Sequence, residues 1–183
     1  MDAGRGGLFA VGGREMSYEG SYVWRVRQRA GDLKLLTATV DVLPVDNEGR
    51  VKLVYPEHVQ GWSVVGGHVE EGDSWRSAAL NELREEAGIV AQRENLVPWA
   101  TISGPGRVFH YRDGDSQAFT LIFLVRKWES EGVQEDGEEI TETGWFGVDE
   151  ALQMEVTPWS KKILLAYKKY LETREFQMME EEG

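Results

Sequence analysis

The chain of 183 residues contains no cysteine, which excludes disulfide bonds and a zinc site built on thiolates. It also lacks a long apolar run, because the longest one, Phe119 to Val125, is far too short to cross a bilayer. The N-terminus lacks the basic and then apolar layout of a secretion signal. These absences fit a cytoplasmic protein without a membrane partner, and we expect that location.

Positive charge is scarce. Lysine and arginine number 20 against 32 aspartates and glutamates, so the net charge is -12. Nonspecific binding to nucleic acid depends on cations that neutralise phosphates, and we therefore expect no nucleic-acid partner. A phosphorylated small molecule remains compatible with this charge, provided that a metal ion screens the repulsion.

Several well-known signatures of chemistry are also missing. The early glycine-rich stretch GGLFAVGG lacks the Gly-Lys-Ser/Thr end of a P-loop, and DNEGR is too short for a calcium loop. There is no nucleophile elbow. The three histidines, His58, His68 and His110, do not have the spacing of metal ligands, and we interpret His68 as a turn residue.

Length and composition predict one soluble domain. A chain of this size can bury a real core, and 41% hydrophobic with 28% charged residues is ordinary for a globular protein. Residues 1–20 contain six glycines and no periodicity, and we interpret them as a flexible tail. We expect the domain to span residues 21–174 and an acidic tail to follow over residues 175–183.

Periodicity and turn residues predict a series of strands. The Tyr22–Gln28 segment, YVWRVRQ, alternates apolar and polar residues. We expect the 50–55 segment to pair back on the strand before it as a hairpin arm, after a turn at residues 46–49. The predicted strands cover residues 22–28, 33–43, 50–55, 61–65, the end of 89–102, 108–112, 117–128 and 145–148.

Three helices are predicted as well. One follows the glycine pair Gly66-Gly67, a short one covers residues 148–152, and a final one runs from Pro158 to about Arg174. This order of strands and helices indicates an α+β fold, with helices packed on a mixed sheet.

The most informative segment is Gly67 to Ile89, GHVEEGDSWRSAALNELREEAGI. Residues i, i+3 and i+4 share one face of a helix, so Glu82, Glu85 and Glu86 fall within roughly a quarter of its circumference. The pair Glu82 and Glu86 costs a bare helix ~0.2–0.5 kcal/mol through like-charge repulsion. A divalent cation would convert that repulsion into binding. The alternative is a solvated acidic face, which leaves the glycine pair unexplained.

This segment resembles the box of the Nudix hydrolases, a MutT-like pattern that reads G-x5-E-x7-R-E-U-x-E-E-x-G-U, with U a bulky apolar residue. Gly67 matches the first glycine, and Glu82 to Ile89 match the second half in register. Asp73 stands where the family has glutamate. Asn81 stands where it has an arginine that pairs with a box glutamate. Arg84 is a poor substitute, because it projects about 160° away from Glu82 around the helix.

The resemblance implies a Nudix-type α/β/α sandwich around a mixed β-sheet. It also implies hydrolysis of a pyrophosphate bond, with Mg²⁺ as the cofactor and Mn²⁺ as the alternative. By the match, Glu85 and Glu86 are metal ligands, Glu82 is a third ligand or orients the attacking water, and the Gly66 carbonyl completes the shell.

Some relatives take the catalytic base from a loop before the late strand. Here Glu138, Glu139 and Glu142 are the candidates, and Glu139 is the best placed. A solvated acidic loop explains the same cluster, so the sequence leaves the base open between Glu82, Glu85 and Glu139.

The substrate is less defined. Pro105 lies sixteen residues past Ile89, a spacing found in relatives that cleave ADP-ribose, although SGPG is also an ordinary turn. Side chains that suit a nucleotide are present: Arg107, Arg112 and Arg126 for phosphates, and Trp62, Phe109 and Tyr111 for stacking on a base.

Three functions compete at this point. The first is a Mg²⁺-dependent hydrolase of a nucleoside triphosphate or a nucleotide sugar. The second is a Nudix-like module that binds a nucleotide without cleaving it, which the departures at Asp73 and Asn81 leave open. The third is a scaffold that acts through its tail and final helix. A homodimer is compatible with each of them.

Overall fold

The computed structural model describes residues 19–57, 59–111, 113–135 and 139–183. Most of the predicted N-terminal tail, residues 1–18, lies outside the described residues, as do His58 and the candidate site residues Arg112 and Glu138. The helices and strands, in chain order, are α1 (Tyr22–Ala30), β1 (Leu35–Pro44), β2 (Val51–Pro56), β3 (Val65–His68), α2 (Trp75–Ala87), β4 (Ile89–Val90), η1 (Arg93–Asn95), β5 (Val97–Ser103), β6 (Val108–Tyr111), β7 (Gly114–Val125), β8 (Ser130–Glu131), β9 (Ile140–Phe146), α3 (Val148–Ala151), α4 (Pro158–Thr173) and β10 (Gln177–Glu180).

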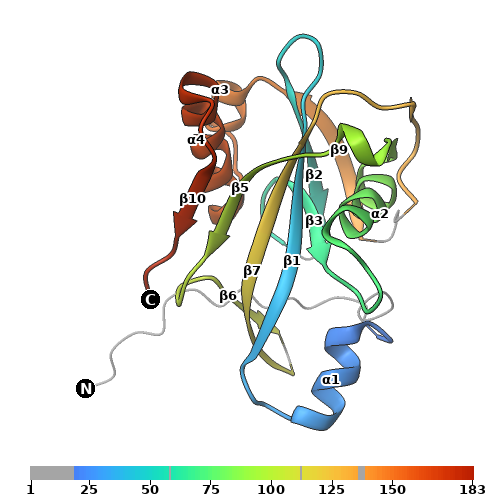
Figure 1. Ribbon diagram of the computed structural model, residues 1–183, viewed down its shortest axis with the longest axis vertical. Helices are drawn as coiled ribbons and strands as arrows, with labels where there is room; N and C mark the ends of the chain where they lie inside the picture. Colours follow the sequence, from blue (N-terminus) through green and yellow to red (C-terminus); the bar gives the residue numbers. More distant parts are fainter. Residues whose placement is uncertain (1–18, 58, 112, 136–138) are drawn as a thin grey trace.

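A mixed sheet forms the centre of the domain, as Figure 1 shows. Its strands follow the order β10-β5-β7-β1-β3, and β6 pairs with β7. The pairs β1–β7 and β10–β5 are parallel, and the other pairs are antiparallel. Two smaller sheets, β2–β9 and β4–β8, adjoin it. The prediction of an α+β fold around a mixed sheet is confirmed.

Helices cover both faces of this sheet (Figure 1). Side chains alternate between the two faces along a strand. In β1, Val40 and Val42 pack in one cluster with Leu83 of α2. Leu43 packs in the other cluster, with Ile163 of α4. The alternation therefore places Asp41 on the face opposite α2, where the cavity described below opens.

The first predicted strand is wrong, because residues 22–28 belong to helix α1. The residues that this segment buries, Val23 and Arg27, are four positions apart, which is the spacing of a helix. Ser21 caps its start, and the Arg27 guanidinium donates a hydrogen bond of 2.9 Å to the carbonyl of Asp115. This contact with β7 is not visible in the local alternation of YVWRVRQ.

The hairpin expected between β1 and β2 is also wrong. Both edges of β1 are occupied within the main sheet, by β3 and β7, so β2 pairs with β9 instead. A single bridge, Val45 to Val51, remains from the expected pairing in the described residues. The strand predicted at residues 61–65 is displaced as well, because β3 begins at Val65 and contains the glycine pair itself.

The predicted helices at residues 148–152 and 158–174 are present as α3 and α4. The C-terminal residues were expected to lie outside the domain as an acidic tail, but β10 adds a parallel strand to the free edge of β5. The division at residue 174 stays a prediction. In the parts of the chain that the structure describes, no helix is both long and apolar enough to cross a membrane.

Candidate active site

Helix α2 carries the acidic residues and is fixed at both ends by its own sequence. Ser74 accepts a hydrogen bond of 3.1 Å from the Ser77 backbone, and Ser77 reciprocates in a capping box. Gly88 ends the helix in the left-handed conformation, with φ 65°. Ala79 and Leu83 are fully buried against the main sheet, so the opposite and lateral faces hold the glutamates.

Glu86 is the central carboxylate of the site. Its Oε2 accepts a hydrogen bond of 2.8 Å from the Gly66 backbone N–H. Burial raises the pKa of Glu86 well above its usual value, and the negative charges of Glu82, Glu139 and Asp41 raise it further. The Gly66 N–H opposes this shift. The charges of three other carboxylates, from α2, from β1 and from the loop before β9, therefore act on Glu86.

The glycine pair makes room for these carboxylates. A Cβ atom on Gly67 would lie 2.7 Å from Cδ of Glu82, so any side chain there would displace the Glu82 carboxylate. A Cβ atom on Gly66 would lie 3.0 Å from Cα of Asp41. The fixed distance between the glycines and the acids in the sequence thus has a steric reason in the structure.

Glu85 is not brought together with the other box glutamates. Its carboxylate lies 2.8 Å from Arg84 Nη2, and its side chain is 44% exposed. Arg84 also pairs with Glu135. Arg84 therefore pairs with a box glutamate, but this glutamate is Glu85 and not Glu82. Asn81 is exposed.

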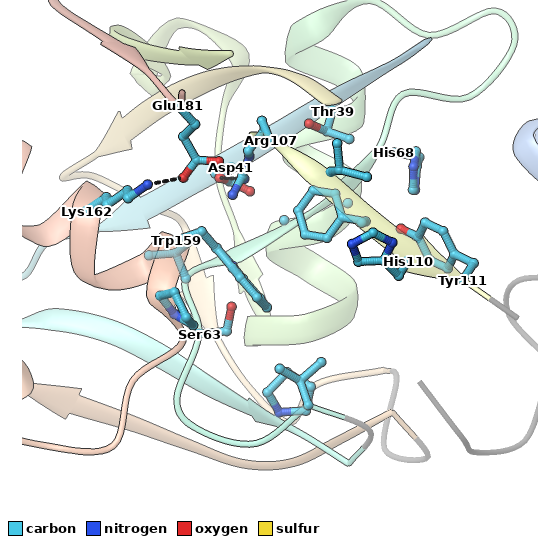
Figure 2. Close-up of a pocket in the computed structure, with 18 of the residues that line it drawn as sticks. Thr39, Asp41, Ser63, His68, Arg107, His110, Tyr111, Trp159, Lys162 and Glu181 are labelled. Carbon is cyan, nitrogen blue, oxygen red and sulfur yellow. Dashed lines mark hydrogen bonds and ion pairs between the residues drawn. The ribbon is translucent and has the colours of Figure 1, made fainter. Parts of the chain in front are cut away.

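A cavity of about 520 Å³ opens beside these residues, and Figure 2 shows many of its side chains. Strands β1 and β3 supply its polar floor, β6 and α4 supply aromatic and basic walls, and the loop before β9 supplies Glu139. Its lining includes Thr39, Asp41, Gly66, Gly67, His68, Glu86, Arg107, Phe109, His110, Tyr111, Glu139, Trp159, Lys162, Glu181 and Glu182.

Sequence reasoning missed Asp41, which is 7% exposed. Burial raises the pKa of Asp41 to about 6, and the positive charge of Arg107 counteracts the rise. Arg107 Nη2 lies 3.6 Å from Asp41 Oδ2, and the guanidinium lies 4.8 Å from the centre of the Phe109 ring. A charged residue inside the apolar strand sequence TVDVL was the signal that could have revealed Asp41.

The predicted phosphate-binding arginines have different positions. Arg107 lines the cavity and is 3% exposed. The Arg126 guanidinium donates a hydrogen bond of 2.7 Å to the Tyr167 hydroxyl and is not among the residues that line this cavity, and its substrate role stays a prediction. Arg126 follows the end of β7 and Tyr167 lies on α4, and the sequence alone does not show that these two elements are neighbours.

The base candidates separate in the same way. Glu139 lines the cavity and acts on the pKa of Glu86, whereas Glu142 is exposed on β9. Among the aromatic candidates, Phe109 and Tyr111 line the cavity. Trp62 packs instead between Tyr55 and Phe146, with ring centres 5.5 and 4.8 Å apart.

Two further cavity residues were not identified from the sequence. His68 is a strand residue of β3 and not a turn residue, and burial lowers its pKa to about 4. Trp159 lies in the first turn of α4 and meets Phe109 edge to face, with ring centres 5.6 Å apart. In the sequence, Trp159 follows Pro158 at the start of a predicted helix, and that position does not indicate a residue of a binding site.

In the described residues, no three acidic or histidine side chains have the arrangement of a complete metal centre. The donor chemistry nevertheless fits a hard cation. Glu86 is a half-buried carboxyl group whose pKa is raised partly by three other acids, and a cation would stabilise its charged form. The metal roles of Glu82, Glu85, Glu86 and Gly66 stay predictions.

A mixed sheet between helices, with a glycine-flanked acidic helix at a cavity, defines a Nudix-type α+β domain. The family model of the NUDIX domain matches residues 35–167. The chain therefore belongs to the NUDIX family, and the prediction of a Nudix hydrolase is confirmed.

Curated relatives agree with this assignment. The chain is similar to the RNA pyrophosphohydrolase of Cereibacter sphaeroides, with 32% identity over 115 residues, 57% of this chain and 70% of the relative. It is also similar to the nucleoside triphosphatase NudI of Salmonella heidelberg, with 35% identity over 44% of this chain and 52% of the relative.

Solved structures share the fold. A MutT NUDIX hydrolase from Burkholderia pseudomallei has a TM-score of 0.60 at 18% identity, covering 72% of this chain and 98% of that chain. A UDP-X diphosphatase has a TM-score of 0.56 at 21% identity, covering 85% of this chain and 73% of that chain.

Proposed function

We propose that this protein hydrolyses a pyrophosphate bond in a nucleoside diphosphate derivative, with Mg²⁺ as the cofactor and Mn²⁺ as a possible substitute. The observation that carries the proposal is the position of Glu86. Its half-buried carboxyl group accepts a hydrogen bond from Gly66 N–H, senses the charges of Glu82, Glu139 and Asp41, and lines a cavity with aromatic and basic side chains.

Glu82 and Glu86 are the proposed metal ligands, with the Gly66 backbone beside Glu86 and with Glu85 as a further candidate. When bound, the metal ion supplies charge neutralisation at the phosphates and lowers the pKa of bound water. Glu139 is the proposed general base, because it lies in the cavity and acts electrostatically on Glu86. Glu82 is the alternative general base, since its carboxylate lies beside Gly67, which lines the cavity.

Arg107 orients the substrate. Its guanidinium is fixed between the Asp41 carboxylate and the Phe109 ring, so it can present N–H groups to a phosphate without losing much side-chain freedom. Phe109 and Trp159 offer ring faces and edges for a nucleobase.

The proposed substrate class is a nucleoside triphosphate or a nucleotide sugar such as ADP-ribose. One relative is named for RNA and another for nucleoside triphosphates. The net charge of -12 favours the small molecule, because an RNA chain adds further negative charge along its length. A location in the cytoplasm and a homodimer stay predictions.

A substrate panel tests the proposal. Phosphate and pyrophosphate release would be measured with nucleoside triphosphates, ADP-ribose and other nucleotide sugars, with and without Mg²⁺. We expect Mg²⁺-dependent turnover of at least one nucleotide, abolished by changing Glu85 and Glu86 together to Gln. Tight binding of a nucleotide with no turnover of any would support the binding module instead.

A further inference from the structure

Glu181, close to the C-terminus, lies in the wall of the proposed substrate cavity and neutralises a lysine there. Among the cavity-lining residues that the structure describes, the lysine and arginine side chains are Arg107 and Lys162. Each already contacts a carboxylate of the chain itself: Arg107 contacts Asp41, and Lys162 Nζ lies 2.6 Å from Glu181 Oε1. A substrate phosphate that enters the cavity therefore meets cations that are already paired.

The backbone of Glu181 is held by the turn between β5 and β6. Its N–H donates to the Ser103 carbonyl at 2.8 Å, and its carbonyl accepts from the Gly106 N–H at 3.0 Å. A Cβ atom on Gly104 would lie 2.8 Å from the Glu181 nitrogen, and one on Gly106 would lie 2.9 Å from the Glu182 carbonyl carbon. The Ser-Gly-Pro-Gly turn thus admits the C-terminal residues because its glycines have no side chain.

A continuous series of contacts connects this segment with the acidic helix. The Gly66 backbone lies against Asp41, and Asp41 pairs with Arg107. Gly106, the residue before Arg107, is hydrogen-bonded to Glu181. Figure 2 shows Asp41, Arg107, Glu181 and Lys162 on the same side of the cavity. A nucleotide whose pyrophosphate lies beside Glu86 is therefore in the same space as Lys162.

We propose that Lys162 binds a phosphate group of the nucleotide substrate and that Glu181 competes with that phosphate for the ammonium group. This inference rests on the proposed function. Carboxylate and phosphate oxygens both accept charge-assisted hydrogen bonds from an ammonium group, so Glu181 occupies Lys162 in the way a substrate phosphate would.

The Lys162–Glu181 pair is suited to exchange. The Lys162 side chain is 53% exposed and the Glu181 side chain 11% exposed, so water and salt screen the pair from the lysine side. Glu181 directly follows a four-residue strand at the edge of the sheet and belongs to neither core cluster, so the exchange involves no core contact. The affinity of the cavity for a phosphate group then depends on how strongly the substrate phosphate and the Glu181 carboxylate each bind the Lys162 ammonium group.

Binding of a methylene-bridged, non-hydrolysable nucleoside triphosphate tests this competition. The dissociation constant would be measured by tryptophan fluorescence, since Trp159 lines the cavity. We expect Glu181→Gln to lower the constant roughly two- to fivefold, in line with a partly exposed ion pair. Lys162→Met should raise it, and Glu181→Gln should have no effect in the Lys162→Met background. Lys162→Arg, which keeps the charge, should preserve the affinity.

Matched controls exclude a general effect of charge. Glu180→Gln changes an exposed glutamate on β10, and Lys161→Met changes an exposed lysine on α4, and neither residue lines the cavity. Neither variant should change the constant. In kinetics, Lys162→Met should raise KM and leave kcat unchanged.

The outcomes separate this inference from the proposed function. If the wild-type chain hydrolyses nucleotides but Glu181→Gln binds the analogue no more tightly, the competition is disproved and the function stands. An equal gain in Glu180→Gln would also disprove it. If the wild-type chain neither binds nor hydrolyses any nucleotide, the proposed function itself fails.

Discussion

The backbone nitrogen of Gly66 and the carboxylate of Glu86, twenty positions apart in the sequence, are joined by a hydrogen bond of 2.8 Å. This bond connects β3 to the last turn of α2 and holds a half-buried carboxyl group at the cavity. The bond also explains the fixed separation of Gly66 and Glu86 in the sequence. Glu86 reaches the Gly66 N–H only if α2 begins a set number of residues after Gly66.

The first prediction concerns Glu86→Gln, which keeps the size of the side chain and removes its charge. We expect kcat to fall by more than about 100-fold, beyond the ~10–100-fold loss typical of residues that only support a metal ligand. Steady-state pyrophosphate release in Mg²⁺ measures this. Glu94→Gln, an exposed change outside the cavity, should retain full activity.

The same variant has an expected effect on stability. The pKa of Glu86 is higher in the folded than in the unfolded chain, so the carboxyl group contributes stability at low pH that is lost as pH rises through the folded pKa. In EDTA, Glu86→Gln should therefore gain stability relative to wild type at pH 8 and not at pH 4. Thermal melts at both values would reveal it, and an identical difference at the two pH values would contradict it.

The second prediction is that Gly67→Ala impairs activity with little loss of stability. The added methyl group displaces the Glu82 carboxylate but meets only the end of a flexible side chain, and no positive φ is involved. We expect the opposite result for Gly49→Ala, which should lower stability and leave activity intact. Gly49 has φ +79° and open space around it, so alanine there should cost about 1–2 kcal/mol and leave turnover intact. Urea unfolding and kinetics of both variants would test the contrast.

The third prediction concerns the buried pair of Arg107 and Asp41. Removing one partner of a buried ion pair typically costs about 3–5 kcal/mol. The pKa of Asp41 is raised from 3.8 to about 6, so its charge is complete at pH 8 and partial at pH 5. Arg107→Met should therefore destabilise the protein more at pH 8 than at pH 5, as measured by urea unfolding.

Lys168 supplies the control for that measurement. It pairs with Asp149 at 2.6 Å, but the two side chains are 46% and 84% exposed. Exposed pairs contribute at most about 1 kcal/mol. Lys168→Met should thus change the free energy of unfolding little, and equally at both pH values. If Arg107→Met loses the same free energy of unfolding at pH 5 and at pH 8, the charge of Asp41 is not the cause of the loss.

The fourth prediction uses His68, whose Nε2 is buried without a hydrogen-bond partner. Its pKa is lowered from 6.5 to about 4, so the unfolded chain binds a proton in this range that the folded chain does not. Stability should fall as pH drops from 6.5 to 4, by up to about 3 kcal/mol from this residue. His68→Gln should remove that slope in urea unfolding, whereas a parallel pH dependence in variant and wild type would contradict the assignment.

The box helix was predictable from the sequence because the information is local. Ser74, Gly88 and the buried positions Leu83 and Ala87 specify the start, the end and the packed face of α2 through contacts within a few residues. The family followed from the same segment, since the glycines and glutamates must recur at one spacing to meet.

Local patterns failed where distant strands decided the outcome. The alternation in residues 22–28 is compatible with a strand, but the Arg27 contact with Asp115 fixes a helix. Arg126 lies in the predicted strand 117–128 but just past the end of β7, where it donates a hydrogen bond to Tyr167.

The sequence by itself determined the acidic helix, the glycine pair and the absence of thiol chemistry, because spacing along one helix and composition need no tertiary information. Only the tertiary structure decided that Asp41, Trp159, Lys162 and Glu181 share a cavity with Glu86. These residues come from β1, α4 and the C-terminal segment, and sheet pairing between strands far apart in the chain is what brings them together.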